Sequence, residues 1–188
     1  FFSGHMSDEI VKVLGNTLIR HTDDSTEVCN SHTVLANKVV GLYFSASWCP
    51  PCKQFTPKLK TFYETIKKRG VEFEIIFVSS DQNETKFTEY YKTMPWLALP
   101  FDDIRKQKLN GLFGVAGIPT LILLDVDGTV ITSSGRAFVT SDPGGADFPW
   151  RGKAVASQLN LWFVVFVAAC ISSSFFLSIY WIYVTFKK

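Results

Sequence analysis

The strongest constraint on the fold of this chain comes from a short apolar run followed by two cysteines and a helical pattern. Residues 38–46 read KVVGLYFSA, and such a run of β-branched and aromatic residues, too short for a helical pattern, is typical of a buried strand. Apolar residues then recur with helical spacing over residues 50–68. Cys49 and Cys52 lie where the strand gives way to the helix. The sequence therefore predicts two thiols at a helix N-terminus.

Strands and helices continue to alternate along the rest of the chain. We predict further strands at 71–80, 119–125 and 130–135, a weaker strand at 17–20, and helices at 83–94 and 102–114. An Asp-Gly pair within residues 126–129 predicts a tight turn between the last two strands. Strands that alternate with helices imply parallel pairing, and the closing hairpin adds an antiparallel edge. We expect an α/β fold in which a mixed sheet carries helices on both faces.

The two ends of the chain differ from its centre. Residues 1–11 are interpreted as a cloning remnant or flexible lead, residues 12–150 as the folded domain and residues 151–160 as a linker. Residues 161–186 carry no charge, are numerous enough to cross a bilayer as one helix, and have aromatic residues near both ends. Residues 187–188 form a basic tail. The sequence therefore predicts one C-terminal transmembrane helix.

The predicted transmembrane helix bears on where the domain works. No basic segment followed by an apolar one precedes the domain, so no signal peptide is recognised. We therefore expect a membrane-anchored protein whose folded domain faces the cytosol. If the apolar C-terminal segment is not native to the protein, the expected location is the cytosol or the nucleus.

Charge and cysteine content argue against three classes of protein. The formal net charge is +2 and the last two residues are both lysine, so we expect no nucleic-acid binding. Four cysteines in 188 residues are fewer than a disulfide-rich secreted scaffold usually carries. One C-x-x-C pair supplies half of a four-ligand zinc set, and the three histidines all precede it without zinc spacing. We expect redox chemistry and no metal site.

The position of the cysteine pair indicates how each thiol would react. Unpaired N–H groups and the partial positive charge of a helix N-terminus favour a thiolate, so we expect Cys49 to have a lowered pKa and to be the nucleophile. Pro50 and Pro51 cannot donate, so the first helical N–H groups available to this sulfur belong to Cys52 and Lys53. Cys52, one turn into the helix, is expected to be the more buried, resolving thiol.

Several segments together resemble the nucleoredoxin and tryparedoxin branch of the thioredoxin-like proteins. They are YFSASWCPPCKQFTP, FEIIFVSSD, MPWLALPF, GIPTLILLDVDG and FPW, within residues 12–158. The resemblance implies a thioredoxin-like fold and a redox loop of Trp48, Cys49, Pro50, Pro51 and Cys52. It also implies that Pro119 is the family's cis-proline, which would leave the Ile118 backbone facing the site. No bound cofactor is expected, because the Cys49–Cys52 disulfide itself is the redox-active group.

One position departs from ordinary thioredoxins. Their buried acid, six residues before the first cysteine, corresponds here to Tyr43, and a phenol with a pKa of about 10 is a poor proton acceptor near neutral pH. Proton transfer to and from Cys52 would then use water or another group, for which Glu72 and Asp81 are candidates. Arg136 is a candidate for the substrate side, with a solvated surface arginine as the alternative interpretation.

These features favour a protein-disulfide reductase in which Cys49 and Cys52 cycle between dithiol and disulfide. Electrons would come from an external reductase or a small dithiol. The substrate would be a protein disulfide, and the tryparedoxin likeness includes that of a peroxidase. Two alternatives stay open: a redox-gated interaction module of nucleoredoxin type with little turnover, and a lumenal disulfide oxidase or isomerase. A membrane would be a further partner, through residues 161–186.

Overall fold

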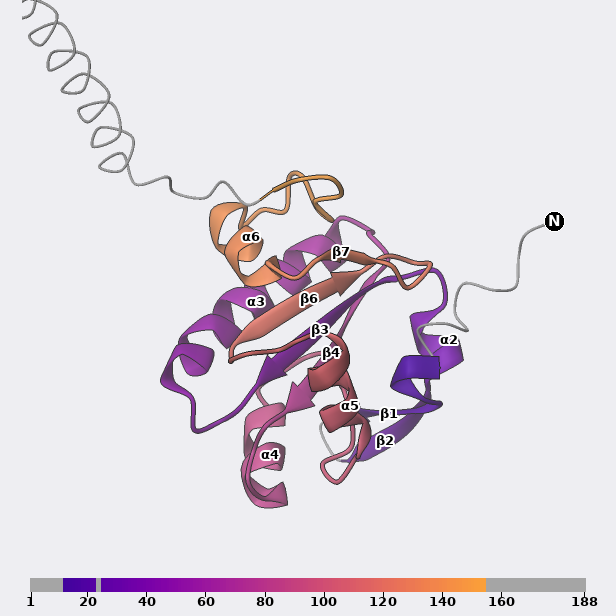
Figure 1. The fold of residues 1–188 in the computed structure, drawn as a ribbon, viewed down its shortest axis with the longest axis vertical. Helices are drawn as coiled ribbons and strands as arrows, with labels where there is room; N and C mark the ends of the chain where they lie inside the picture. Colours follow the sequence, from indigo (N-terminus) through magenta and orange to yellow (C-terminus); the bar gives the residue numbers. More distant parts are fainter. Residues whose placement is uncertain (1–11, 23–24, 155–188) are drawn as a thin grey trace, which may run out of the picture. The chain divides into compact units, whose positions relative to one another are not determined.

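The computed structural model describes residues 12–22 and 25–154, which form a seven-stranded sheet flanked by helices (Figure 1). The strands are β1 (Thr17–His21), β2 (Thr26–Asn30), β3 (Val39–Ser45), β4 (Phe73–Ser79), β5 (Leu97–Ala98), β6 (Thr120–Leu124) and β7 (Val130–Thr132). The helices are α2 (Ser31–Leu35), α3 (Pro50–Lys68), α4 (Glu84–Tyr91), α5 (Arg105–Leu112) and α6 (Gly135–Ser141). The strands lie in the order β2-β1-β5-β4-β3-β6-β7, so the predicted α/β fold with a mixed sheet is confirmed.

The centre of the sheet is the strand–helix–strand unit that the sequence predicts. β3 and β4 pair in parallel from Val39↔Phe73 to Ser45↔Ser79, so both strands end at the same edge of the sheet. β4 also pairs in parallel with the two-residue strand β5. We call the edge at which β3 and β4 end the carboxyl edge.

β6 runs opposite to the direction that the alternation of strands and helices implies. It pairs antiparallel with β3, from Val40↔Leu124 to Phe44↔Thr120. β5 ends at the carboxyl edge, and the connection that contains α5 brings the chain back into the sheet at that same edge, whereas the connection through α4 crosses to the opposite edge. The prediction of parallel pairing is wrong for this strand. As a result, β6 begins beside Phe44, at the carboxyl edge.

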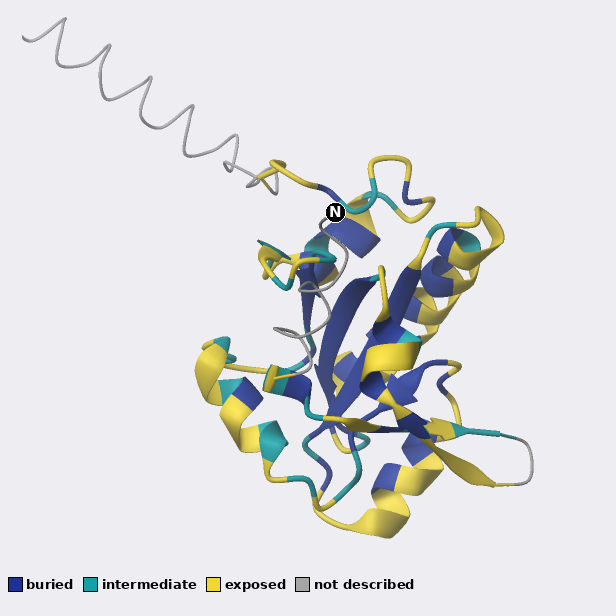
Figure 2. Cartoon of the chain, turned by 90° about the vertical axis from the view of Figure 1, so that its right-hand side faces the viewer, coloured by how far each residue is buried: buried dark blue, intermediate teal, exposed yellow. Residues whose placement is uncertain are grey.

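Helices cover both faces of the sheet, and the central strands are buried between them (Figure 2). On one face Tyr43 of β3 contacts Phe55 of α3, with ring centroids 5.9 Å apart. On the other face Leu42, its neighbour on the strand, belongs to an apolar cluster that includes Leu35 of α2 and Leu109 of α5. Because side chains alternate along a strand, β3 contributes to both layers of the core.

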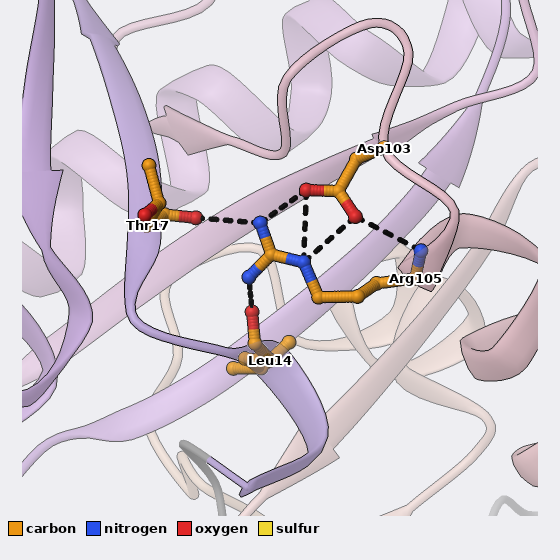
Figure 3. Close-up of polar contacts among 4 residues, drawn as sticks. All are labelled: Leu14, Thr17, Asp103 and Arg105. Atoms are coloured by element: carbon orange, nitrogen blue, oxygen red, sulfur yellow. Dashed lines mark hydrogen bonds and ion pairs between the residues drawn. The ribbon is translucent and has the colours of Figure 1, made fainter.

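An arginine ties the N-terminal part of the described chain to α5 (Figure 3). The guanidinium group of Arg105 donates to the carbonyl oxygens of Leu14 and Thr17, the latter at 2.9 Å. Its Nε also donates to both carboxylate oxygens of Asp103, at 2.7 and 2.8 Å. This residue therefore links the segment before β1 to the start of α5.

The last described residues pack back onto the domain. Trp150 is buried and stacks on Phe62 of α3 and Phe138 of α6, with ring centroids 5.3 and 5.1 Å apart. Arg151 follows and donates from its guanidinium to the carboxylate of Asp125, at 2.6 Å for the pair Nη2–Oδ1. The first residue of the predicted linker thus contacts the end of β6.

Within residues 12–22 and 25–154, no helix is both long and apolar enough to cross a membrane. The predicted N-terminal lead at 1–11, transmembrane helix at 161–186 and basic tail at 187–188 lie outside the described residues. Most of the predicted linker at 151–160 lies outside them as well. These four assignments stay predictions.

Candidate active site

The two cysteines lie at the carboxyl edge, where β3 passes into α3. Cys49 is the N-cap of α3, with extended backbone angles, and Pro50 and Pro51 are the first two helical residues. The Cys52 N–H donates to Sγ of Cys49 at 3.3 Å, and the Lys53 N–H donates to the Cys49 carbonyl oxygen at 3.1 Å. The predicted arrangement is confirmed, because the prolines leave the sulfur a donor only from the third helical residue onward.

Cys49 and Cys52 are joined in a disulfide, with Cα atoms 5.2 Å apart. The described structure is therefore the oxidised form of the pair. Cys49 is 3% exposed and Cys52 is fully buried, so the expected order of burial is confirmed. Of the two cysteines only Cys49 has any exposed surface, and attack on a disulfide needs access to one sulfur.

The start of β6 completes the site from a distant part of the sequence. The Ile118–Pro119 peptide bond is cis, as the resemblance implies. The Sγ of Cys49 lies 3.7 Å from the carbonyl oxygen of Ile118. The antiparallel direction of β6 produces this contact, because Thr120 pairs with Phe44 and so places the preceding residues beside the disulfide.

The loop before Cys49 is held by groups at the end of β4. Trp48 is 55% exposed, and its indole N–H donates to the Ser80 carbonyl oxygen at 3.0 Å. The buried carboxylate of Asp81 accepts from the Ser47 N–H at 2.7 Å and from the Ser79 hydroxyl at 2.8 Å. Each Asp81 oxygen therefore bonds to the backbone or side chains around the loop, which makes this residue a support for the loop geometry.

Tyr43 is fully buried, and its hydroxyl lies 2.7 Å from Oγ1 of Thr56. Burial raises the pKa of the Tyr43 phenol well above its usual value of 10. A group that keeps its proton so firmly does not accept one from a thiol near neutral pH. The expectation that the tyrosine is a poor proton acceptor is therefore strengthened.

Glu72 lies far from the disulfide, so its proposed part in proton transfer is wrong. It is exposed and immediately precedes Phe73, at the start of β4. Because β3 and β4 are parallel and both end at the carboxyl edge, the start of β4 lies at the opposite edge, roughly 20 Å away at about 3.3 Å per strand residue.

Arg136 lies beside an open groove that begins at the cis-proline. It is exposed, on the first turn of α6, and lines a hollow of about 500 Å³ together with Pro119, Thr120 and Thr140. α6 lies directly on β6 because residue 135 is glycine: an added Cβ would be 2.7 Å from the Leu121 carbonyl oxygen. The groove thus begins at Pro119, beside the Ile118 carbonyl that contacts Cys49, and carries the exposed Arg136 side chain and several hydroxyls.

Comparisons with known proteins agree with this geometry. The thioredoxin-like family model matches residues 37–130. The chain belongs to the thioredoxin-like family. It is 52% identical over 120 residues to tryparedoxin from Trypanosoma brucei brucei, a match covering 62% of this chain and 81% of that protein. Tryparedoxin II from C. fasciculata superposes with a TM-score of 0.71 at 38% identity, covering 79% of this chain and 97% of that one.

Nucleoredoxins are relatives of a different length. Nucleoredoxin from Danio rerio is 45% identical over 145 residues, which is 77% of this chain. That match covers only 34% of the relative, so the chain spans about a third of its length. The predicted resemblance to the nucleoredoxin and tryparedoxin branch is confirmed.

Members of this family work through redox-active cysteines and without a bound cofactor. Among the described residues, no group of three or more His, Cys, Asp or Glu side chains is placed to hold a metal ion. The buried Cys29 is a free thiol. The chemistry of this thioredoxin-like domain therefore centres on Cys49 and Cys52.

Three residues near the disulfide were missed from the sequence: Ser45, Thr56 and Tyr90. Their hydroxyls connect beneath Cys52. The position of Thr56 near the disulfide could have been predicted, because Thr56 follows Cys52 by four residues and so lies on the same face of the helix. The position of Tyr90 could not have been predicted from local spacing, since this residue lies on α4 and reaches the site only through the tertiary fold.

Proposed function

We propose that this thioredoxin-like domain is a thiol–disulfide oxidoreductase that reduces protein disulfides, with Cys49 as nucleophile and Cys52 as resolving thiol. The observation that carries the proposal is the placement of the disulfide. Cys49 caps α3 and accepts the Cys52 N–H, and its Sγ lies 3.7 Å from the carbonyl oxygen of Ile118, the residue before Pro119, which lines the groove. Cys52 lies behind Cys49 without exposed surface.

The proposed reaction consists of two exchange steps. In the reduced form, the Cys49 thiolate attacks one sulfur of a substrate disulfide and forms a mixed disulfide, and the other substrate sulfur leaves as a thiolate and takes up a proton. The Cys52 thiol then loses its proton and attacks the Cys49 sulfur, which releases the second substrate sulfur as a thiolate that takes up a proton. The substrate gains two electrons and two protons, and the domain ends with the Cys49–Cys52 disulfide. A reductase or a small dithiol restores the dithiol.

The groove beside the disulfide suggests which molecules exchange electrons with it. The exposed Arg136 lines the groove together with Thr120 and Thr140, whose hydroxyls donate to the carbonyl oxygens of Gly117 and Arg136. A carboxylate on a peptide or on a small peptidic thiol would pair with this guanidinium. The tryparedoxin II of one solved structure is complexed with glutathionylspermidine, a ligand of that class. We therefore propose small peptidic thiols as electron donors and protein disulfides, including those of peroxidases, as substrates.

The test is turnover of insulin disulfides by the full chain, with dithiothreitol as electron donor. We expect Cys49→Ser to abolish turnover. Reduced Cys52→Ser, mixed with insulin after removal of dithiothreitol, should accumulate a mixed disulfide at Cys49 that it cannot resolve. Cys29→Ser is the matched control, since it removes a buried thiol outside the site and should leave turnover unchanged. Turnover that survives in Cys49→Ser would overturn the assignment of the nucleophile.

A redox-gated binding role is the second candidate. The large apolar surface of Trp48 adjoins the disulfide, so a partner bound there would sense the state of both cysteines. Capture of a partner by only one redox state, together with no turnover of insulin or a peroxidase disulfide, would favour this role over the reductase.

We further propose that the domain works in the cytosol, anchored by residues 161–186. The support is the uncharged C-terminal run. Protease added to intact, unpermeabilised microsomes or organelles should degrade the domain if it faces the cytosol. Protection of the domain would favour a lumenal oxidase or isomerase instead, and recovery in the soluble fraction would place the protein in the cytosol or nucleus without an anchor.

A further inference from the structure

Four buried hydroxyl groups are connected directly beneath the redox disulfide. They belong to Tyr43, Ser45, Thr56 and Tyr90, none of them more than 8% exposed. Oγ1 of Thr56 lies 2.7 Å from the Tyr43 hydroxyl and 2.6 Å from the Tyr90 hydroxyl. The Tyr90 hydroxyl lies 3.0 Å from Oγ of Ser45. Thr56 also donates to the Cys52 carbonyl oxygen at 3.0 Å, so it connects the group to the redox helix.

The number of hydrogens fixes the direction of these bonds. A threonine hydroxyl has one hydrogen to donate and two lone pairs that accept. Since Thr56 donates to the Cys52 carbonyl, both Tyr43 and Tyr90 must donate to Thr56. Ser45 in turn donates to Tyr90, whose own hydrogen is used. Burial raises the pKa of the Tyr43 phenol and keeps its hydrogen in place, so all donors point toward the Cys52 carbonyl.

That carbonyl belongs to a peptide unit that is held at both ends. The Cys52–Lys53 unit accepts the Thr56 hydroxyl through its oxygen and donates the Lys53 N–H to the Cys49 carbonyl. The adjoining Cys52 N–H donates to Sγ of Cys49. Pro50 has no N–H to replace that donor. The bond from the Thr56 hydroxyl therefore adds a second hold, beyond the regular helical bonds, on the turn that serves the sulfur.

We propose that Thr56 is a positioning residue for the Cys49 sulfur. It acts through the first turn of α3, because its hydroxyl connects the other buried hydroxyls to the Cys52 carbonyl oxygen. The proposal rests on Cys49 being the nucleophile of the proposed reductase. While the Thr56 hydroxyl bonds to the Cys52 carbonyl oxygen, the Cys52 N–H stays directed at the Cys49 sulfur and stabilises the thiolate over the thiol. Without that hydroxyl, the turn samples other geometries and two phenols lose their acceptor.

The test uses Thr56→Val, which keeps the shape of the side chain and removes the hydroxyl. The full chain is reduced, and alkylation of Cys49 by iodoacetamide is followed by mass spectrometry across pH; in this reaction the thiolate sulfur displaces iodide. We expect alkylation at pH 7 to slow roughly threefold, on the scale of one neutral hydrogen bond, and the midpoint of the pH profile to rise.

Thr61→Val is the matched control. Thr61 makes the same bond on the same helix, from its hydroxyl to the Pro57 carbonyl at 3.2 Å, but on an exposed turn away from the disulfide. We expect its profile to match the wild type. Thr56→Ser, which restores the hydroxyl, should also return the wild-type rate. A merely structural role for Thr56 would lower stability without moving the pH profile.

A Thr56→Val profile that superimposes on that of the wild type, in a folded protein, would overturn the proposal. If Thr56→Val does not fold, Tyr90→Phe decides, since it removes one donor to Thr56 and keeps the ring. A smaller slowing in the same direction supports the proposal, and an unchanged profile overturns it. Alkylation requires no protein disulfide, so a wild type that fails to reduce insulin would refute the proposed function without affecting this result.

Discussion

Glu74 is a buried carboxyl that the proposed chemistry does not use. It is 5% exposed and accepts hydrogen bonds from the Tyr63 hydroxyl at 3.0 Å and from the Ile75 N–H at 3.1 Å. Burial raises the pKa of the Glu74 carboxyl above its ordinary value of about 4.5, outweighing the opposing effect of these bonds. The folded protein therefore disfavours the charged form of this group relative to the unfolded chain.

We expect Glu74→Gln to stabilise the protein at pH 8 and to change its stability little at pH 4. Below about pH 4.5 the wild-type carboxyl is mostly protonated in both the folded and the unfolded state. Between about pH 4.5 and the raised pKa of the folded state, the carboxyl ionises in the unfolded chain but not in the folded protein, so the wild-type free energy of unfolding falls as pH rises through this range. Glutamine keeps an oxygen for Tyr63 and has no charge to bury. Urea unfolding at both pH values measures the difference, and a variant less stable than the wild type at pH 8 would contradict the argument.

Asp81 supports the loop before the nucleophile through two hydrogen bonds. We expect Asp81→Ala to lower the free energy of unfolding by about 2 kcal/mol, because the Ser47 N–H loses a charged acceptor. Turnover should fall as well, since the loop carries Trp48 and Cys49. Urea unfolding and insulin reduction measure the two effects. Asp102→Ala, at an exposed aspartate, is the control and should change neither.

At the scale of elements, close packing of α6 on β6 depends on one glycine. An added Cβ at residue 135 would meet the carbonyl oxygen and side chain of Leu121. We expect Gly135→Ala to push α6 outward, to lower stability by about 1–3 kcal/mol, and to raise KM for substrates that use Arg136. The rate of Cys49 alkylation should not change. An unchanged KM with lowered stability would show that the groove does not bind substrate.

Gly111 offers the opposite case on α5. An added Cβ there meets nothing within 4 Å, and the residue lies inside α5 without a positive φ. Gly111→Ala should therefore stabilise the protein, by up to about 1 kcal/mol, because alanine loses less backbone entropy than glycine in a helix. Thermal unfolding of the two alanine variants side by side separates steric conflict from helix propensity.

The elements differ in how far the sequence could predict them. β3, α3 and β4 were predicted closely because their apolar patterns are long and their side chains are largely buried or show a clear face. β2 was missed because it is an edge strand with four of five residues exposed, and β5 because it has only two residues. The direction of β6 was wrong, since no local pattern records the edge from which a chain re-enters a sheet.

The same limit applies to the candidate site. The cysteine pair and the start of β6 carry local signals, a helix start after a strand and a proline before one, and both were placed correctly. Glu72 and Asp81 were weighed as similar carboxylates, yet they lie at opposite edges of the sheet. Their separation depends on strand length and register, which the residue type alone does not give.

At the scale of the whole molecule, Arg105 joins segments that are about 90 residues apart in the chain. We expect Arg105→Ala to increase hydrogen–deuterium exchange in β1 and β2, because the Leu14 and Thr17 carbonyls lose a shared donor and Asp103 loses its counter-ion. Exchange at the start of α3 should stay as in the wild type. Lys108→Ala, an exposed change on the same helix, is the control, and equal exchange in both variants would contradict the role of Arg105.

The aromatic stack at Trp150 has a mechanical consequence. A force applied to the chain beyond residue 154 would first meet the stacking of Trp150 on rings of α3 and α6 and the ion pair between Arg151 and Asp125. Asp125 follows Leu124, which pairs with Val40 at the edge of the sheet opposite the cysteines. Load applied through the C-terminal side therefore enters the domain at one end, while disulfide exchange takes place at the other. A tether attached there would therefore not pull directly on the reactive loop.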